Sequence, residues 1–213
     1  MNFKENDLLT LRYVKAGQAG KVLTLTSQDI SNKEFTEETL ELINVHDGDM
    51  FIVIGESMAP EFIHTGNILL VEACDSFALS YGDFVILEVD GKQQNFLSKV
   101  LTGNCNFGYK LRKFISVLDI SSDADSLFEK SCMIDIETNF DKEHNKAVFF
   151  DKLVKARARI PKEEYAKVLL SVTYTETGRD FSFHASRDLC AKVTHVLCKN
   201  KEGKYVENAN VNR

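Results

Sequence analysis

One short segment of the chain combines residue types that can support nucleophilic chemistry. It reads Gly55-Glu56-Ser57-Met58-Ala59-Pro60. Gly55 lets the backbone turn sharply after an apolar run, and Pro60 prevents that run from continuing as a strand. A serine on such a corner is raised out of the sheet, and the amides of Ser57 and Met58 can then form an oxyanion hole. Taken alone, the segment also fits a purely structural turn, because serine, glycine and proline are ordinary turn residues.

A nucleophilic serine needs a base, and Lys99 is the candidate that the sequence offers. In the stretch Phe96-Leu97-Ser98-Lys99-Val100-Leu101, strand alternation puts Leu97, Lys99 and Leu101 on one face. An ammonium among leucines favours the uncharged form, which can accept a proton. The alternative is a lysine on an edge strand with its tip in water. The five histidines of the chain carry no catalytic motif.

The elements expected around these residues are mostly strands. Between residues 49 and 101, short runs rich in β-branched and aromatic residues alternate with turns of Gly, Asn and Asp. Another strand pair is expected at 148–160, and a hairpin around Lys199 to Lys204. One helix is expected at 31–44, where Ser31 and Glu34 fit a capping box. The other predicted strands are Met50 to Ile54, Ile68 to Val71, Phe84 to Val89, Phe96 to Leu101, Val168 to Thr175 and Arg179 to His184.

The ordered set of these residues resembles the LexA/UmuD-type Ser–Lys peptidases, which include the catalytic halves of LexA and of phage repressors. The nucleophile motif of that family, Gly-x-Ser-Met-x-Pro, is complete at 55–60. An apolar strand after Gly66, a Gly-Asp-strand segment from Gly82 and a strand bearing Lys99 follow in the order that the family has. Asn67 departs from the Asp that the family commonly has after the glycine, at a turn position that tolerates either residue.

The resemblance implies a mostly β, LexA-like peptidase fold of twisted antiparallel sheets with minor helix. The closing strand pair of that fold resembles the stretch from Val148 to Ala158. We accordingly divide the chain into an N-terminal arm at 1–20, a peptidase domain at 21–161 and a β-rich C-terminal extension at 162–213. The resemblance gives the extension no role.

Many members of the family cut themselves at an Ala–Gly bond ahead of the nucleophile. This chain has two such bonds, Ala16-Gly17 and Ala19-Gly20. Small residues allow the segment to enter a narrow cleft, so that the scissile carbonyl can approach Ser57. We favour Ala16-Gly17, because Val14-Lys15-Ala16-Gly17-Gln18 is similar to the apolar-x-Ala-Gly-polar segment of the family. The alternative is a flexible turn of small residues.

Composition excludes several classes of protein. The 213 residues carry a formal charge of -6, and 44% are hydrophobic, which does not fit a disordered chain. No apolar run reaches the ~20 residues of a membrane-spanning helix. The acidic balance makes direct binding to duplex DNA unfavourable. The five cysteines are widely spaced and lack metal-binding motifs, so we expect free thiols in a reducing cytoplasm, without a metal or other cofactor.

By the resemblance, the layout is closest to UmuD, because the residues before Ala16 are too few for a DNA-binding domain. It implies a cytoplasmic homodimer that loses its N-terminal arm in the SOS response to DNA damage, with an activated RecA filament as the stimulator. A client protein could bind the 162–213 extension. Two other interpretations stay open. One is a non-cleaving module of the same fold for dimerisation or peptide binding, and the other is a peptidase that acts in trans on a partner protein.

Overall fold

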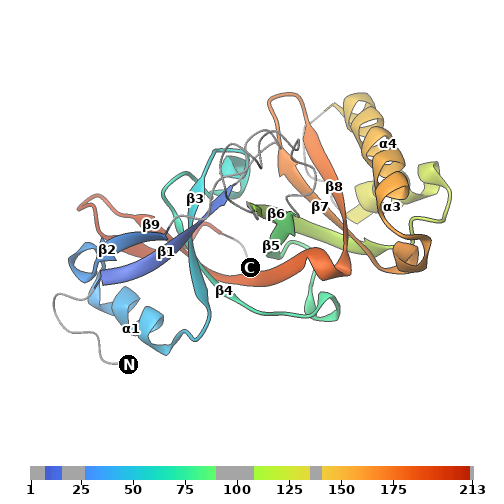
Figure 1. The fold of residues 1–213 in the computed structure, drawn as a ribbon. Coiled ribbons are helices and arrows are strands. Elements are labelled where there is room, and N and C mark those ends of the chain that lie inside the picture. The colour runs from blue at the N-terminus through green and yellow to red at the C-terminus, as the bar shows by residue number, and fades with distance from the viewer. Residues whose placement is uncertain (1–7, 16–26, 90–107, 135–140, 212–213) are drawn as a thin grey trace, which may run out of the picture.

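The computed structural model describes residues 8–15, 27–89, 108–134 and 141–211. Within them the chain forms one mostly antiparallel sheet of ten strands, and the class is mixed α/β (Figure 1). The order across the sheet is β2-β1-β3-β4-β9-β5-β6-β7-β8, and β10 pairs with β9. The strands are β1 (Leu8–Lys15), β2 (Ser27–Ser31), β3 (Asp49–Ile54), β4 (Ile68–Glu72), β5 (Phe84–Val89), β6 (Gly108–Leu118), β7 (Val168–Tyr174), β8 (Arg179–Ala185), β9 (Leu189–Lys199) and β10 (Tyr205–Glu207).

Most of the predicted strands are confirmed. β3, β4, β5, β7 and β8 coincide with predicted apolar runs, and the hairpin around Lys199 to Lys204 joins β9 to β10. Two of the predicted turns rest on glycines in the left-handed region, with φ of 87° at Gly66 and 91° at Gly82. The predicted strand from Phe96 to Leu101 lies outside the described residues.

The C-terminal residues complete the centre of the sheet. β9 pairs with β4 on one side and with β5 on the other, and Figure 1 shows it as a long strand through the centre of the sheet. Its residues Val196 and Leu197 are buried. The stretch that the sequence leaves without a role therefore supplies a strand on which the fold of the central sheet depends.

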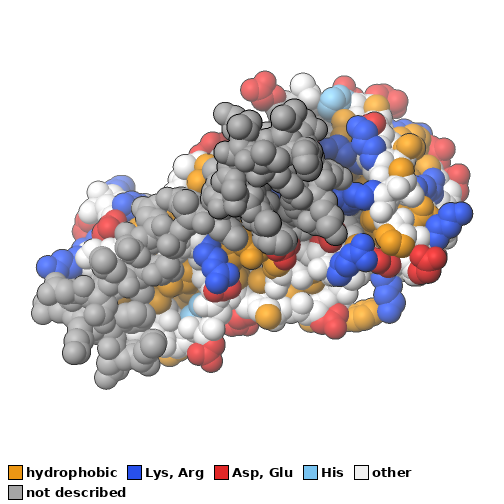
Figure 2. Space-filling model, in the orientation of Figure 1, with side chains coloured by type: hydrophobic (Ala, Val, Ile, Leu, Met, Phe, Trp, Pro, Cys, Tyr) orange, Lys and Arg blue, Asp and Glu red, His pale blue; other side chains and the backbone are white. Residues whose placement is uncertain are grey.

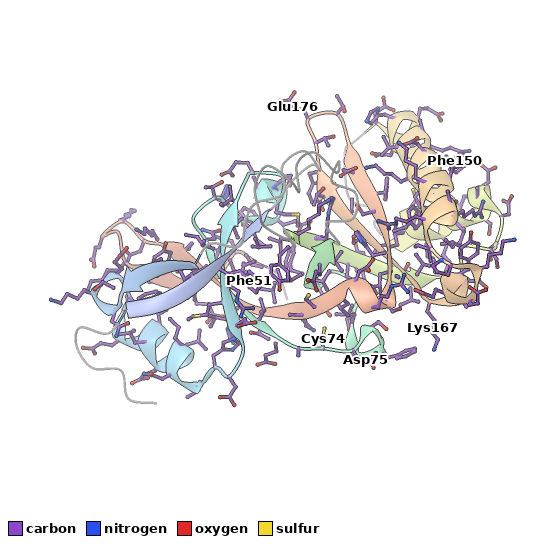
Figure 3. The ribbon with its side chains drawn as sticks, in the orientation of Figure 1. Phe51, Cys74, Asp75, Phe150, Lys167 and Glu176 are labelled. Atoms are coloured by element: carbon purple, nitrogen blue, oxygen red, sulfur yellow. The ribbon has the colours of Figure 1, made fainter. Side chains whose placement is uncertain are left out.

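The strand pair predicted at 148–160 is wrong, and so is its match to the closing strands of the LexA/UmuD family. Helix α4 (Lys142–Arg159) occupies this stretch, and the carboxylate of Asp141 caps its first free amides. It packs beside α3 (Ala124–Ile134), and its residue Phe150 is labelled in Figure 3. The buried residues of α4 follow helical spacing and face the sheet: Asn145, Phe149, Leu153 and Ala156.

The helix predicted at 31–44 exists but begins later. Thr36 is the N-cap of α1 (Glu37–Val45), and Ser31 caps a separate 3₁₀ turn, η1 (Asn32–Glu34). Together with α3 and α4, this gives more helix than the minor share that was expected. The other 3₁₀ turns are η2 (Ala59–Glu61), η3 (Ser76–Ala78), η5 (Lys162–Lys167) and η6 (Ser186–Asp188).

The described surface mixes charges of both signs. Acidic and basic side chains are interspersed on the face shown in Figure 2. Some form exposed pairs, such as Asp151 with Lys155 on α4. In the described part of the chain, no helix is long and apolar enough to cross a membrane.

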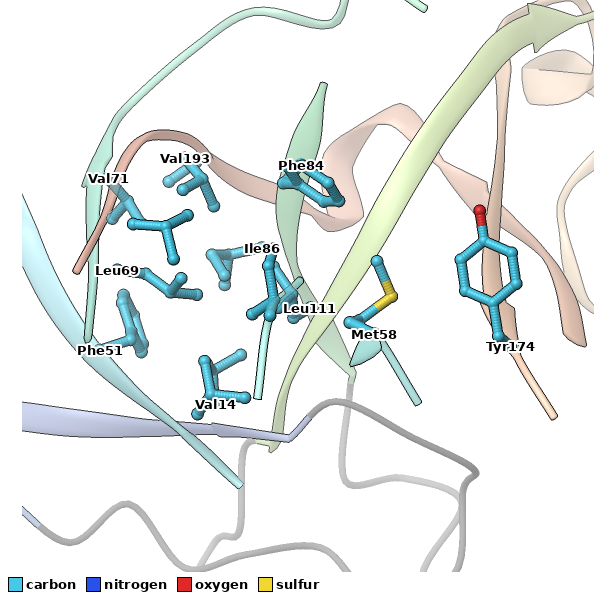
Figure 4. Close-up of a cluster of buried hydrophobic side chains, with 14 residues drawn as sticks. Val14, Phe51, Met58, Leu69, Val71, Phe84, Ile86, Leu111, Tyr174 and Val193 are labelled. Atoms are coloured by element: carbon cyan, nitrogen blue, oxygen red, sulfur yellow. The ribbon is translucent and has the colours of Figure 1, made fainter. Parts of the chain in front are cut away.

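The sheet curls around a central apolar core. β1 pairs in parallel with β3, and its last residue, Lys15, also pairs with Lys110 of β6. The predicted N-terminal arm therefore contains a strand inside the sheet. β1, β3, β4, β9, β5 and β6 all contribute to one core, part of which Figure 4 labels. Its members are Val14, Phe51, Val53, Met58, Ile63, Leu69, Val71, Phe84, Ile86, Leu111, Tyr174, Ala191, Val193 and Val196.

Candidate active site

The predicted nucleophile turn is a compact corner at the end of β3. Gly55 has φ of 103°, a conformation that favours glycine, and its amide donates to Thr65 Oγ1 at 2.9 Å. η2 follows at once and contains Pro60 near its start. The amide of Ile63 donates back to the carbonyl of Met58 at 3.2 Å, which closes the corner. The glycine and the proline thus do what the sequence predicts for them.

Ser57 is held at this corner by its backbone. Its carbonyl accepts a hydrogen bond from the amide of Tyr174, the last residue of β7, at 3.0 Å. The Oγ atom is buried and makes no hydrogen bond with any described residue. Ser116 and Ser171 also have buried hydroxyls without a hydrogen bond to a described residue, so the feature that sets Ser57 apart is its place in the motif at the end of β3.

Met58 anchors the corner in the core. It is fully buried and lies between Leu111 and Tyr174 in Figure 4. Within the described ranges, the amides of Ser57 and Met58 donate to no backbone group. Two adjacent amides without a backbone acceptor among the described residues meet one requirement for an oxyanion hole, which is donors available to an incoming oxygen.

A polar cluster that includes the last residue of η2 was not predicted from the sequence. Glu61, the last residue of η2, accepts a hydrogen bond from the hydroxyl of Tyr174, and its carboxylate lies 2.6 Å from Lys113 Nζ on β6. The side chains of Lys113 and Glu61 are only 15% and 20% exposed. The cluster therefore fastens the corner to both β6 and β7.

Lys113 is a lysine of the described residues that contacts the nucleophile corner through Glu61. Its Nζ is already engaged by Glu61, so Lys113 does not fit the role of a free base for Ser57. Sequence reasoning missed the cluster because its three residues come from segments far apart in the chain. The available signal was alternation in β6, where Leu111 and Lys113 share the face that meets the core containing Met58.

The other predicted site residues lie outside the described residues. Lys99 falls in 90–107, and the bonds Ala16-Gly17 and Ala19-Gly20 fall in 16–26. The strands that flank both segments are described, and they meet at one end of the sheet. Lys15 pairs with Ile54, three positions before Ser57, and with Lys110, which itself pairs with Leu87 of β5.

Comparisons of the chain with models of protein families, with curated proteins and with solved structures find no match.

The Glu61 cluster gives a testable prediction. We expect Glu61→Gln to slow any reaction at Ser57 by about tenfold, because the corner loses the ion pair that fixes its orientation. Glu56→Gln is the matched control: Glu56 lies in the same corner but is exposed, and its hydrogen bond with His64 lowers the pKa of its carboxyl. Equal rates of self-cleavage for the two variants would show that the cluster does not position Ser57.

Proposed function

We propose that this protein is a serine peptidase in which Ser57 is the nucleophile and Lys99 the base, and that it cleaves itself at Ala16-Gly17. Neutral Lys99 takes the proton from Ser57 Oγ, and the oxygen attacks the carbonyl carbon of Ala16. The amides of Ser57 and Met58 donate to the oxyanion. The C–N bond to Gly17 then breaks, and its amine takes the proton from Lys99. Water hydrolyses the acyl-enzyme and releases the Ala16 carboxylate.

The observation that carries this proposal is the placement of β1 beside the nucleophile corner. The parallel pairing of Lys15 with Ile54 brings the residue before Ala16 alongside the end of β3. Ser57 follows Ile54 after three positions, and its buried hydroxyl makes no hydrogen bond with a described residue. A strand that leads towards the candidate bond and ends beside the nucleophile corner favours proximity, which is the first condition of an intramolecular reaction. Ala19-Gly20 is the second candidate bond.

The compartment, the oligomeric state and the trigger that we propose come from the resemblance to UmuD-type proteins. We propose a cytoplasmic homodimer, cut in the SOS response to DNA damage and stimulated by an activated RecA filament. Because residues 162–211 form strands of the central sheet, a client protein would contact their exposed parts rather than a separate appendage.

The dependence of cleavage on pH tests the role of Lys99. A base must be uncharged to accept a proton, so we expect self-cleavage to accelerate from neutral pH towards pH ~9–10. Lys99→Ala should lose this rise together with most of the activity, and Lys99→Arg should do the same because arginine stays charged. Quantitative mass spectrometry after incubation across the pH range gives the rates. A Lys99→Ala protein that keeps the pH profile of the wild type would exclude Lys99 as the base.

A cavity favours the second candidate function, a non-cleaving module that binds peptides. It has a volume of about 680 Å³ and is lined by residues of β1, β3, β4, β6 and β9, among them Phe51, which Figure 3 labels. Its lining combines apolar side chains with three carboxylates, at Asp47, Asp49 and Glu72, and this combination suits a basic side chain of a peptide. Burial and the neighbouring Glu88 raise the pKa of the Cys190 thiol to about 11. The lining is Arg12, Asp47, Gly48, Asp49, Phe51, Val71, Glu72, Ala73, Tyr109, Cys190 and Ala191.

A further inference from the structure

β1 is an interior strand of the sheet, which bears on the fate of the N-terminal arm. It pairs antiparallel with β2 from Leu8–Ser31 to Arg12–Ser27, and parallel with β3 from Arg12–Phe51 to Lys15–Ile54. In the order of the described sheet, β1 joins β2 to the rest. If β1 left, backbone donors and acceptors of both neighbouring strands would lose their partners.

Two side chains of β1 are also buried in the core of the molecule. Leu11 and Val14 are both 0% exposed, and they enter two different cores. Leu11 packs in the cluster that contains Ile30 and Phe35, and Val14 packs in the central core with Phe51. β1 is therefore buried on both faces, which is typical of a strand that belongs to the folded unit.

A charged contact also holds β1 in place. Arg12 Nη1 lies 2.8 Å from Asp49 Oδ2, at the edge of the slot between β2 and β3 that β1 fills. Residues 16–26 join β1 to β2 along the chain, and both candidate cleavage bonds lie in them. A cut there breaks the covalent connection of β1 and removes none of its contacts with β2 and β3.

From this arrangement we propose that fragment 1–16 stays bound through β1 after the cut, and that the slot between β2 and β3 is a docking site for the same strand of a second copy. The proposal rests on the proposed self-cleavage at Ala16-Gly17. Before the cut, the covalent link holds each strand in its own slot at high effective concentration. After the cut, the strand is a separate peptide, and cleaved molecules can exchange it.

Mass spectrometry of the cleaved protein tests this inference. Full-length protein is left to cleave at alkaline pH, returned to neutral pH and passed through gel filtration. We expect fragments 1–16 and 17–213 to elute together at 1:1, to give one mass under native conditions and two masses under denaturing conditions. Mixing ¹⁵N-labelled with unlabelled cleaved protein should produce hybrid masses. A folded 17–213 fragment that elutes alone, or a mixture without hybrids, would overturn the proposal.

Charge reversal at the edge of the slot gives a matched control. Arg12→Glu places a carboxylate against Asp49, and it should speed exchange of the strand by about fivefold. Adding Asp49→Arg restores opposite charges and should return the exchange rate to near that of the wild type. An exchange rate that neither change affects would mean that the strand is not held in this slot.

Whether β1 stays bound after its link to β2 is cut can be tested even if the protein does not cleave itself. A thrombin site in place of residues 21–26 would allow the same link to be cut by an added protease. A wild type that stays uncut, together with a strand that is retained after thrombin cleavage, would count against the proposed function and for the docking slot. Efficient self-cleavage with loss of fragment 1–16 would count for the proposed function and against the docking slot.

Discussion

Replacing Ser57 with alanine is expected to lower the rate of self-cleavage by at least about 10³-fold, because the reaction loses the atom that attacks. The same change should leave the free energy of unfolding nearly unchanged. The Oγ atom is buried and makes no hydrogen bond with any described residue, so its removal takes no hydrogen bond away from the described fold. Loss of activity without loss of stability distinguishes a nucleophile from a structural serine.

Ser131 provides the matched control for that variant. Its hydroxyl is also buried, but it donates to the carbonyl of Phe128 at 2.7 Å. Ser131→Ala should therefore cost about 1 kcal/mol of stability and leave the rate of self-cleavage unchanged. Urea unfolding and quantitative mass spectrometry measure the two properties. If Ser57→Ala loses stability as Ser131→Ala does and still cleaves, Ser57 is a structural turn residue.

Replacing Asp180 with alanine is expected to destabilise the fold by about 3–5 kcal/mol, because it leaves the fully buried guanidinium of Arg112 without its counter-charge. Arg112 Nη1 lies 3.2 Å from Asp180 Oδ2, and Lys152 Nζ lies 2.9 Å from Oδ1. Arg112 also donates to the hydroxyl of Thr173. These contacts tie β6, β7 and β8 to helix α4, so their loss loosens the half of the sheet that carries Lys113 and Tyr174.

The pH dependence of stability should show the same interaction. Burial alone would raise the pKa of the Asp180 carboxyl, but Arg112 and Lys152 outweigh burial and the pKa is lowered. A lowered pKa in the folded state means that the carboxylate stabilises the fold at pH values above the unfolded pKa of ~3.9, and that this contribution is lost as the pH falls through the folded pKa. The difference between wild type and Asp180→Ala should therefore shrink in acid.

Asp151→Ala is the control for the buried pair. Asp151 and Lys155 form an exposed pair one turn apart on α4, and their side chains are 54% and 69% exposed. Its loss should cost no more than about 0.5 kcal/mol. Urea unfolding at neutral pH compares the variants. Equal midpoints for Asp180→Ala and Asp151→Ala would contradict a stabilising role for the buried pair.

Local patterns predict much of this fold. β3, β4 and β5 follow from alternation and from turn residues such as Gly66 and Gly82, since both signals act within a few residues. The run Val148-Phe149-Phe150 misleads because three adjacent apolar residues fit a buried strand as well as a helix. The helical repeat of α4 emerges only when Asn145 and Ala156 are counted with it. The place of β9 between β4 and β5 depends on long-range pairing that no local pattern encodes.

In the candidate site, too, the local motif could be predicted from the sequence and the long-range contacts could not. Ser57 and Met58 lie in a contiguous motif whose backbone geometry follows from Gly55 and Pro60. The contacts of Glu61 with Lys113 and Tyr174 could not be predicted, because they join segments that only the folded sheet brings together. The adjacency of β1 to the nucleophile corner was missed for the same reason, since parallel pairing of Lys15 with Ile54 has no signature in either segment.

Intact-mass measurement of the purified wild-type protein tests the central claim most directly. After incubation at pH ~9–10, we expect two fragments whose masses add up to the parent plus one water, with the break after Ala16 or Ala19. The Ser57→Ala protein should keep the parent mass under the same conditions. A wild-type protein that stays intact for days, or a Ser57→Ala protein that yields the same fragments at the same rate, would contradict the account.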